Sequence, residues 1–210
     1  MTTRLISITP DAEKTMLYVA RVSSLRQESK STGLLGYCLK HEHWSVFEHA
    51  FMTNEIETSR AISPQILRHR SFTFSEFSQR YSAVEDDPEF IEARYQDTKN
   101  RQNSIICADT GELEWWDKAQ EEVWDLAHLR YEQAITKGIA KEVARNLLPA
   151  MTPTKLYMSG SVRSWLHYIN LRSGNGTQKE HQDIALGCKE IFTEQLPIIA
   201  KALGWTNEAT

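Results

Sequence analysis

The stretch of sequence that most constrains this chain is RHRSFTFSEFSQRYS, residues 68–82. Arginines, a histidine and a glutamate alternate here with phenylalanines and small hydroxyl side chains. Such a mixture is costly to bury, and its aromatic rings are unusual in a solvent-exposed loop. Arginine offers a planar fork of donors that fits phosphate, and Arg68, Arg70 and Arg80 are close enough in sequence to reach one dianion or pyrophosphate. The stretch therefore predicts a local surface for an anionic, aromatic ligand.

The same stretch also has a purely structural interpretation. Residues 59–68 have a helical pattern, which puts Arg68, His69 and Arg70 at a helix C-terminus, where cations meet the favourable end of the dipole. Such charge–dipole and surface ion-pair contacts each contribute about 0.5 kcal/mol. If residues 68–70 leave the helix in an extended form, Arg68 and Arg70 share one side and His69 points to the other. Composition alone supports the two interpretations equally.

Composition indicates one folded domain, residues 1–210. Of the 210 residues, 40% are apolar and 25% are charged, and this length supports one sizeable core. No segment has the apolar run that a membrane span requires, and the N-terminus lacks the basic and apolar regions of a secretory leader. The sequence therefore predicts a cytoplasmic protein without a membrane partner.

Charge and cysteine content argue against further classes of protein. A net charge of −4 and a pI near 6.0 disfavour a general nucleic-acid binder, so the cations of residues 68–80 are interpreted as a local site. Cys38, Cys107 and Cys188 are far apart and form no C-x-x-C pair. They predict buried free thiols rather than disulfides or a zinc cage.

Helical patterns outnumber strand patterns along the chain. Helices are predicted over residues 10–22, 34–41, 59–68, 113–137, 140–147, 162–171 and 179–203. Strands are predicted over residues 5–8, 46–56, 90–95 and 154–159, and residues 71–82 are predicted as a connection. Because the strands are scattered between helices, the expected class is α+β, a single helix-rich domain with a small mixed or antiparallel sheet.

Local signals refine this pattern in three helices. Thr9 is predicted as an N-cap with Pro10 at the first helical position, and Ser161 or Gly160 as the N-cap of the helix over 162–171. Pro197 predicts a kink in the last helix. Mobility is expected in the polar loop 25–33 and in the segment 83–110.

Two further clusters combine histidine with charged side chains. His41, His43, Glu48 and His49 include metal-ligand types, but their spacing differs from a helical H-E-x-x-H, and no metal site is predicted. Residues 161–172 read SVRSWLHYINLR, which puts Arg163 and His167 one turn apart on a helix and Arg172 at its C-terminal end. Helix dipole and amphipathic patterning explain these positions without a ligand. This ligand-free interpretation becomes weaker when the three clusters are considered together.

These segments resemble the flavin-dependent thymidylate synthases. Residues 68–81 are similar to the family motif R-H-R-x-x-S-x-N-E-x-S-x-R-Y, with Thr73 for the usual serine and Ser75 for the usual asparagine. Residues 20–23, 43–49, 141–149 and 163–172 also match the family in order, so the resemblance covers most of residues 20–182. Ser161 and His167 stand where some members carry asparagine, and Gly176 where some carry histidine.

The resemblance implies a methyltransferase of dTMP biosynthesis. The family converts dUMP to dTMP, taking a methylene group from 5,10-methylenetetrahydrofolate and a hydride from NADPH through FAD. It also implies a domain that assembles as a homotetramer, with each FAD held among several subunits.

The resemblance further assigns site residues. FAD would be contacted by Ser45, Arg68, His69, Arg70, Glu76, Ser161, Val162, Arg163 and His167, with Ser23 and His43 lining the flavin site. The nucleotide would be contacted by Gln65, Ile66, Leu67, Arg68, Glu76, Phe77, Ser78, Gln79, Arg80, Arg145 and Arg172. No cysteine lies in a matching segment, so polarisation of the uracil ring by Arg172 must replace covalent attack, and Arg172 is the expected catalytic residue.

The sequence leaves two other functions as alternatives. The first is a metal-dependent nucleotide phosphohydrolase that uses His41, His43, Glu48 and His49. The second is a non-enzymatic nucleotide- or RNA-binding module centred on residues 68–82.

Overall fold

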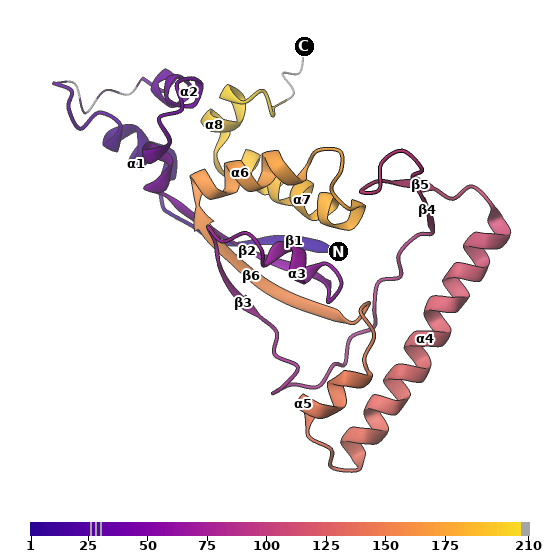
Figure 1. Cartoon of the computed structure of the whole chain (residues 1–210). Helices are drawn as coiled ribbons and strands as arrows, with labels where there is room; N and C mark the ends of the chain where they lie inside the picture. The colour runs from indigo at the N-terminus through magenta and orange to yellow at the C-terminus, as the bar shows by residue number, and fades with distance from the viewer. Residues whose placement is uncertain (26, 28, 30, 207–210) are drawn as a thin grey trace.

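A four-stranded antiparallel sheet forms the centre of the structure (Figure 1). This computed structural model describes residues 1–25, 27, 29 and 31–206. The strands lie in the order β1-β2-β6-β3, with bounds β1 Thr2–Ile8, β2 Phe51–Ser59, β6 Pro153–Ser161 and β3 Thr73–Glu76. The central strands pair along their whole lengths, from Phe51 opposite Ser161 to Ser59 opposite Pro153. This pairing brings together two segments that are distant in the sequence.

Helices from the C-terminal part of the chain cover one face of this sheet. The helices α6 Val162–Arg172 and α7 Lys179–Gln195 pack on each other, α6 against β2 and α7 against β1 (Figure 1). The helix α8 Pro197–Ala202 continues from α7 and packs on α2 Gly33–Lys40. At the same end of the molecule lie α1 Ala12–Val19 and the 3₁₀ helix η1 Trp44–Glu48, which contacts α6.

The main hydrophobic core lies between the sheet and these helices. The sheet contributes alternate residues, so Met52 and Ile56 of β2 and Leu156 and Met158 of β6 are almost completely buried. The helices contribute Trp165, Ile169, Ile184, Cys188 and Phe192, which are also completely buried. This core fixes α6 on the sheet.

The long helix α4, Thr110–Thr136, stands away from the sheet (Figure 1). It begins at Asp109, whose side chain accepts hydrogen bonds from the backbone N–H groups of Gly111 and Glu112. A second apolar cluster holds it against α5 Lys141–Ala144 and the loop at Val84, and α4 also contacts the 3₁₀ helix η2 Arg145–Leu147. The buried members of this cluster are Val84, Trp124, Tyr131, Ala134 and Ala144.

A small antiparallel hairpin precedes α4. Its strands are β4 Arg94–Gln96 and β5 Ser104–Ile106. Asp97 accepts hydrogen bonds from the backbone N–H groups of Lys99 and Asn100, which closes the turn between the strands.

The structure confirms the α+β class and the antiparallel arrangement of the sheet. Strands near 5–8 and 154–159 and helices near 34–41, 113–137 and 162–171 are present, each within a few residues of its predicted bounds. Ser161 is the N-cap of α6, as predicted. Among the described residues, no helix has the length and apolar content needed to cross a bilayer.

The predicted start of the first helix was wrong. Its N-cap is Asp11, and the helix begins at Ala12. Thr9 instead bonds the neighbouring strand, its backbone N–H donating to the Phe51 carbonyl at 2.9 Å and its hydroxyl accepting from the Phe51 N–H at 2.9 Å. The same helix ends at Val19, before the predicted end at 22. The predicted loop 25–33 includes residues 26, 28 and 30, which lie outside the described residues.

Four other predicted elements also needed correction. Residues 46–48 belong to η1, because the strand begins only at Phe51, where pairing with β6 begins. The helix predicted over 59–68 is reduced to α3 Ser63–Ile66, since β2 continues to Ser59 and the helix turn ends at Leu67.

The predicted connection 71–82 contains β3, which is stabilised by its pairing with β6 rather than by its own pattern. The hairpin lies at 94–106, so the strand predicted over 90–95 is shifted and β5 was missed. At Pro197 the last helix divides into α7 and α8, and the Glu13 carboxylate accepts from the Ile199 N–H at 2.9 Å just after the break.

Gly160 provides a test of the packing between β6 and residue 72. A Cβ atom at this position would lie 2.5 Å from Cδ1 of Phe72, whose ring packs on Trp165 with centroids 4.9 Å apart. We expect Gly160→Ala to lower the free energy of unfolding in urea by about 1–3 kcal/mol, because the buried ring must move. Gly33→Ala is the control, because a Cβ there has no heavy atom within 4 Å. Equal stability of the two variants would contradict the expected clash.

Candidate active site

The arginine-rich segment follows the short helix α3. The helix ends at Ile66 with Leu67 as its C-cap, so Arg68, His69 and Arg70 lie beyond it. Arg68 and Arg70 are exposed, whereas His69 is buried. Within the described part of the chain, neither arginine side chain forms a hydrogen bond or an ion pair. The two guanidinium groups are therefore available to an anion.

His69 is joined to Arg172, the last residue of α6. The Arg172 Nε–H donates a hydrogen bond of 3.0 Å to Nε2 of His69. The two residues are 103 positions apart in the sequence. Arg172 is half-buried and lies at the negative end of the α6 dipole, which favours its charge. This contact joins the arginine-rich segment to the third cluster of the sequence.

Two rings lie close to His69. Tyr168 meets it edge to face at a centroid distance of 4.9 Å, and His181 lies 6.2 Å away. Tyr168 and His181 are completely buried. The hydroxyl of Tyr168 and both ring nitrogens of His181 have no hydrogen-bond partner among the described residues.

Burial keeps both histidines neutral. Burial, the charge of Arg172 and that of His167 lower the pKa of His69 to about 4. Burial, Arg172 and His69 lower the pKa of His181 to about 4 as well. At neutral pH the His69 ring therefore has one nitrogen with a lone pair, and the hydrogen bond from Arg172 identifies that nitrogen as Nε2.

Glu76 ends β3 and is held by three side chains. Its Oε1 atom accepts from the Ser63 hydroxyl at 2.6 Å and from the Thr154 hydroxyl at 3.0 Å. Arg60 forms an ion pair with the same oxygen at 2.7 Å. These contacts fix the carboxylate near the start of α3.

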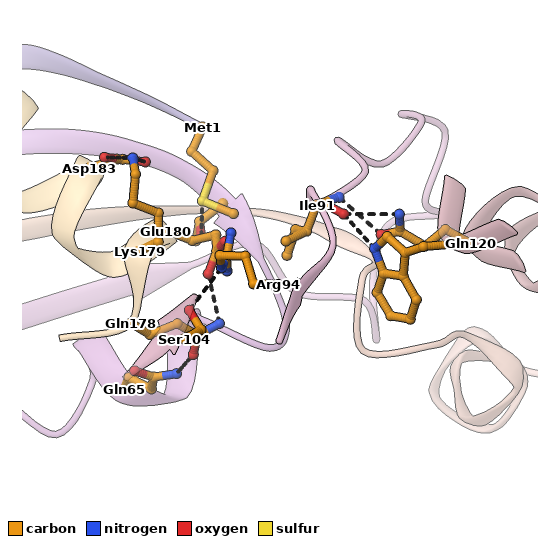
Figure 2. A network of polar contacts seen from close by, with 12 residues as sticks. Met1, Gln65, Ile91, Arg94, Ser104, Gln120, Gln178, Lys179, Glu180 and Asp183 are labelled. Carbon is orange, nitrogen blue, oxygen red and sulfur yellow. Dashed lines mark hydrogen bonds and ion pairs between the residues drawn. The ribbon is translucent and has the colours of Figure 1, made fainter. Parts of the chain in front are cut away.

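Gln65 belongs to a polar network between α3, α7 and the hairpin (Figure 2). Its Nε2 donates to Oε1 of Gln178 at 2.7 Å, and Nε2 of Gln178 donates to Oε2 of Glu180 at 2.8 Å. Glu180 also forms a buried ion pair with Arg94. The orientation of Gln65 therefore depends on the first turn of α7.

The other nucleotide contacts assigned by resemblance lie in different environments. Ile66 is completely buried in the main core, and Leu67 is exposed. Gln79 is buried, and its Nε2 has no hydrogen-bond partner among the described residues. Phe77, Ser78 and Arg145 are half-buried, whereas Arg80 is exposed and pairs with Glu142 at 3.3 Å.

The remaining flavin contacts assigned by resemblance lie in α6, at its N-cap, or in η1, which contacts this helix. The Ser161 hydroxyl caps this helix by accepting from the Ser164 N–H, and Val162 is completely buried in the core. Arg163 pairs with Glu48 at 2.9 Å, while Ser45 and His167 are exposed. The Ser161 hydroxyl and the Arg163 guanidinium lower the pKa of Glu48.

Several contacts of this site were not predicted from the sequence. Arg60, Ser63 and Thr154 hold Glu76, but they lie outside the family motif and carry no local signal. Tyr168 and His181 fall at buried positions of amphipathic helices, where the helical pattern predicts core residues. A histidine at such a position is the one signal that could have indicated His181.

The histidine cluster near η1 has no geometry for a metal. His41, His43, Glu48 and His49 are exposed, and Glu48 is paired with Arg163. Over the described residues, no group of three or more histidine, cysteine, aspartate or glutamate side chains has metal-binding spacing.

The chain is similar to known proteins along almost its whole length. Residues 4–198 match the family described as thymidylate synthase complementing protein. A probable flavin-dependent thymidylate synthase of Paramecium bursaria Chlorella virus 1 is 50% identical, with 98% of this chain and 100% of the relative covered. The flavin-dependent thymidylate synthase of Synechocystis sp. is 53% identical over 92% of this chain and 90% of the relative.

The fold also has a match among solved structures. The UMP/dUMP methylase PolB of Streptomyces cacaoi, solved with 5-Br dUMP, superposes with a TM-score of 0.86 at 22% identity, covering 97% of this chain and 94% of PolB. The fold and the sequence matches together define an enzyme of the thymidylate synthase complementing class. The chain belongs to the flavin-dependent thymidylate synthase family.

The two neutral histidines predict that stability depends on pH. Both have a pKa of about 4 in the folded protein against an ordinary value of 6.5, so between these values the unfolded chain binds more protons. We expect the free energy of unfolding to decrease as the pH falls from 6.5 towards 4. His69→Gln keeps an acceptor for Arg172 and should make this decrease shallower.

Urea unfolding at several pH values measures this effect. His41→Gln is the matched control at an exposed position. The interpretation is wrong if His69→Gln and the wild type lose stability with the same slope.

Proposed function

We propose that this enzyme converts dUMP to dTMP by reductive methylation, with 5,10-methylenetetrahydrofolate as carbon donor, NADPH as reductant and FAD as the bound flavin. The observation that carries the proposal is the 3.0 Å hydrogen bond between Arg172 and His69. It unites the motif segment, residues 68–81, with a second segment that resembles the family, residues 163–172. Family membership supports the same reaction and weighs against the phosphohydrolase and the binding module.

The residues around this hydrogen bond fit a flavin dinucleotide. Arg68 and Arg70 are exposed cations without a partner among the described residues, and a pyrophosphate would satisfy both. The proposed FAD contacts are these arginines with Ser45, His69, Glu76, Ser161, Val162, Arg163 and His167. The side chain of Val162 is in the core, so any contact from this residue would come from its backbone. When bound, the flavin supplies the hydride chemistry that no side chain can perform.

The nucleotide site is proposed on the adjacent surface. Arg80 and Arg145 suit the phosphate of dUMP, and the unsatisfied amide of Gln79 suits an oxygen of the ligand. Gln65, Arg68, Glu76, Phe77, Ser78 and Arg172 complete the proposed contacts. Ile66 and Leu67 belong to this segment, but the core position of Ile66 leaves only its backbone for contact.

Arg172 is the proposed catalytic residue. Carbon 5 of uracil is a poor nucleophile, and a positive charge at the ring oxygen or nitrogen favours the ionised, more reactive ring. The Arg172 Nε–H is committed to His69, which leaves the two amino groups of the guanidinium for the uracil. His69, being neutral, orients the guanidinium without opposing its charge.

No thiol is needed in the proposed mechanism. Cys38, Cys107 and Cys188 are all buried free cysteines. Burial raises the pKa of Cys38 and raises that of Cys188 to about 12, which disfavours a nucleophilic thiolate. Polarisation by Arg172 takes the place of covalent activation.

We further propose that residues 1–210 form one domain that assembles as a homotetramer. On α4, Val123, Leu126 and Leu129 are about half exposed, although all three are large and apolar. A second copy of the chain would cover this face, as expected for a symmetric oligomer.

A visible spectrum of the purified protein tests the proposed function. We expect a flavin absorption band that NADPH bleaches, and dTMP formation when dUMP and methylenetetrahydrofolate are then added. Because both signals come from the same sample, the assay links flavin reduction to methylation. A colourless protein, or one whose reduced flavin does not methylate dUMP, would refute the proposal.

Arg172→Ala tests the catalytic assignment. We expect flavin content to be unchanged and turnover to fall by about a hundredfold or more, because charge stabilisation at the uracil is lost. Flavin absorbance and single-turnover dTMP formation measure the two effects separately. Arg130→Ala is the control, since Arg130 is an exposed residue of α4 that bonds Gln133. Turnover close to the wild-type rate in Arg172→Ala would remove Arg172 from the mechanism.

A further inference from the structure

A chain of side-chain hydrogen bonds connects α3 to a buried ion pair. Gln65 of α3 donates from Nε2 to Oε1 of Gln178 at 2.7 Å, and Gln178 donates from Nε2 to Oε2 of Glu180 at 2.8 Å (Figure 2). Gln178 is the N-cap residue of α7, and Glu180 lies in the first turn of that helix. The chain of hydrogen bonds therefore joins a proposed nucleotide contact, Gln65, to the N-terminus of α7.

The Glu180 end of this chain only accepts hydrogen bonds. Glu180 is buried, and its Oε1 atom is ion-paired with Arg94. The side chain of Arg94 is itself only 15% exposed, and it also donates from Nε to the Ser104 hydroxyl at 3.0 Å. Because a carboxylate has no hydrogen to donate, Glu180 must receive an N–H from Gln178. The nitrogen of the Gln178 amide is thus directed towards Glu180.

The amide of Gln178 in turn fixes the direction of the Gln65 amide. An amide has an NH₂ group at one end and a carbonyl oxygen at the other, and its neighbours decide which way it faces. With its nitrogen on Glu180, Gln178 presents its oxygen to Gln65, and Gln65 must donate from its own nitrogen. The carbonyl oxygen of Gln65 has no hydrogen-bond partner among the described residues and is available to a ligand.

A carbonyl oxygen at this position favours particular groups of a nucleotide. It accepts hydrogen bonds from N–H and O–H groups, and it repels the oxygens of a phosphate. The nucleotide dUMP has two such donors, the imide N–H of uracil and the hydroxyl of the sugar. Gln65 is half-buried, so a ligand that covered its oxygen without donating would cost a hydrogen bond to water.

We propose that Gln178 is a positioning residue for Gln65. Held by Glu180, it turns the Gln65 amide so that the oxygen faces the nucleotide site and accepts from an N–H or O–H group of dUMP. The inference rests on the proposed function, which makes Gln65 a contact of dUMP. Gln178 itself acts only through Gln65.

Substitution of both glutamines tests this role. Gln178→Met keeps the length of the side chain and removes both hydrogen bonds, and the position is exposed, so the variant should fold. We expect its affinity for dUMP to fall about fivefold with unchanged flavin content. Gln65→Met should lower the affinity about tenfold, and Gln178→Met should have no further effect in that variant. Calorimetric titration of the flavin-loaded proteins with dUMP measures these affinities.

Two analogues of dUMP identify the donor group. One carries a methyl group on the imide nitrogen, and the other lacks the hydroxyl of the sugar. The analogue without the relevant donor should bind wild type and Gln178→Met equally, whereas the other analogue should keep the difference seen with dUMP. If both analogues kept that difference, the Gln65 oxygen would accept from neither group and the inference would be wrong.

Gln120→Met is the matched control. Gln120 is a buried amide of α4 with two hydrogen bonds to the backbone of Ile91, at 2.9 and 3.0 Å (Figure 2). Its loss should lower stability without changing the affinity for dUMP. Equal affinities of wild type and Gln178→Met, or losses that add up when Gln65→Met and Gln178→Met are combined, would overturn the inference.

A further measurement does not require ligand. The side-chain amide ¹⁵N–H signals of Gln65 report its hydrogen bond to Gln178, so they should shift in Gln178→Met and stay in place in Gln120→Met. Unshifted signals in Gln178→Met would also overturn the inference. If instead the wild-type protein does not bind dUMP, the proposed function fails while these signals still report the orientation of Gln65, so the two failures are distinguishable.

Discussion

The pairing of β2 with β6 is the constraint on which the rest of the structure depends. These strands match residue for residue from Phe51 opposite Ser161 to Ser59 opposite Pro153. Because β6 passes directly into α6 at Ser161, the register of the pair also sets where that helix begins. It sets the place of β3 as well, since β3 pairs with the other edge of β6. A slip by one residue would turn the core side chains of both strands towards solvent.

The candidate site places the charged Arg172 close to two histidines that stay neutral. Arg172 lies near two histidines, and a proton on either ring would add a second positive charge in a poorly hydrated place. Keeping both rings neutral removes that repulsion and turns His69 into an acceptor. The charge of Glu76 is also compensated locally, because Arg60 and two hydroxyl groups offset the cost of its partial burial. The positions of the proposed ligand contacts Arg172 and Glu76 are thus determined by the side chains that hold them.

The sequence predicted the class of fold and the elements with strong periodicity, and it indicated the arginine-rich segment as a site. It did not predict β3, because residues 73–76 become a strand only by pairing with β6. It predicted a strand at 46–48, where packing on α6 favours a 3₁₀ turn instead. The contact between His69 and Arg172 spans 103 positions. The local sequence pattern carries no information about contacts between residues so far apart.

The helix α6 also sets the distance between the two proposed ligand sites. The proposed flavin contacts Ser161 and Arg163 lie at its start, and the proposed nucleotide contact Arg172 is its last residue. A helix rises 1.5 Å per residue, so Val162 and Arg172 are separated along the axis by about 15 Å. One inserted residue would lengthen this span only slightly, but it would rotate Arg172 by about 100° and away from His69. The helix therefore sets spacing and direction together, and its length can change only by whole turns.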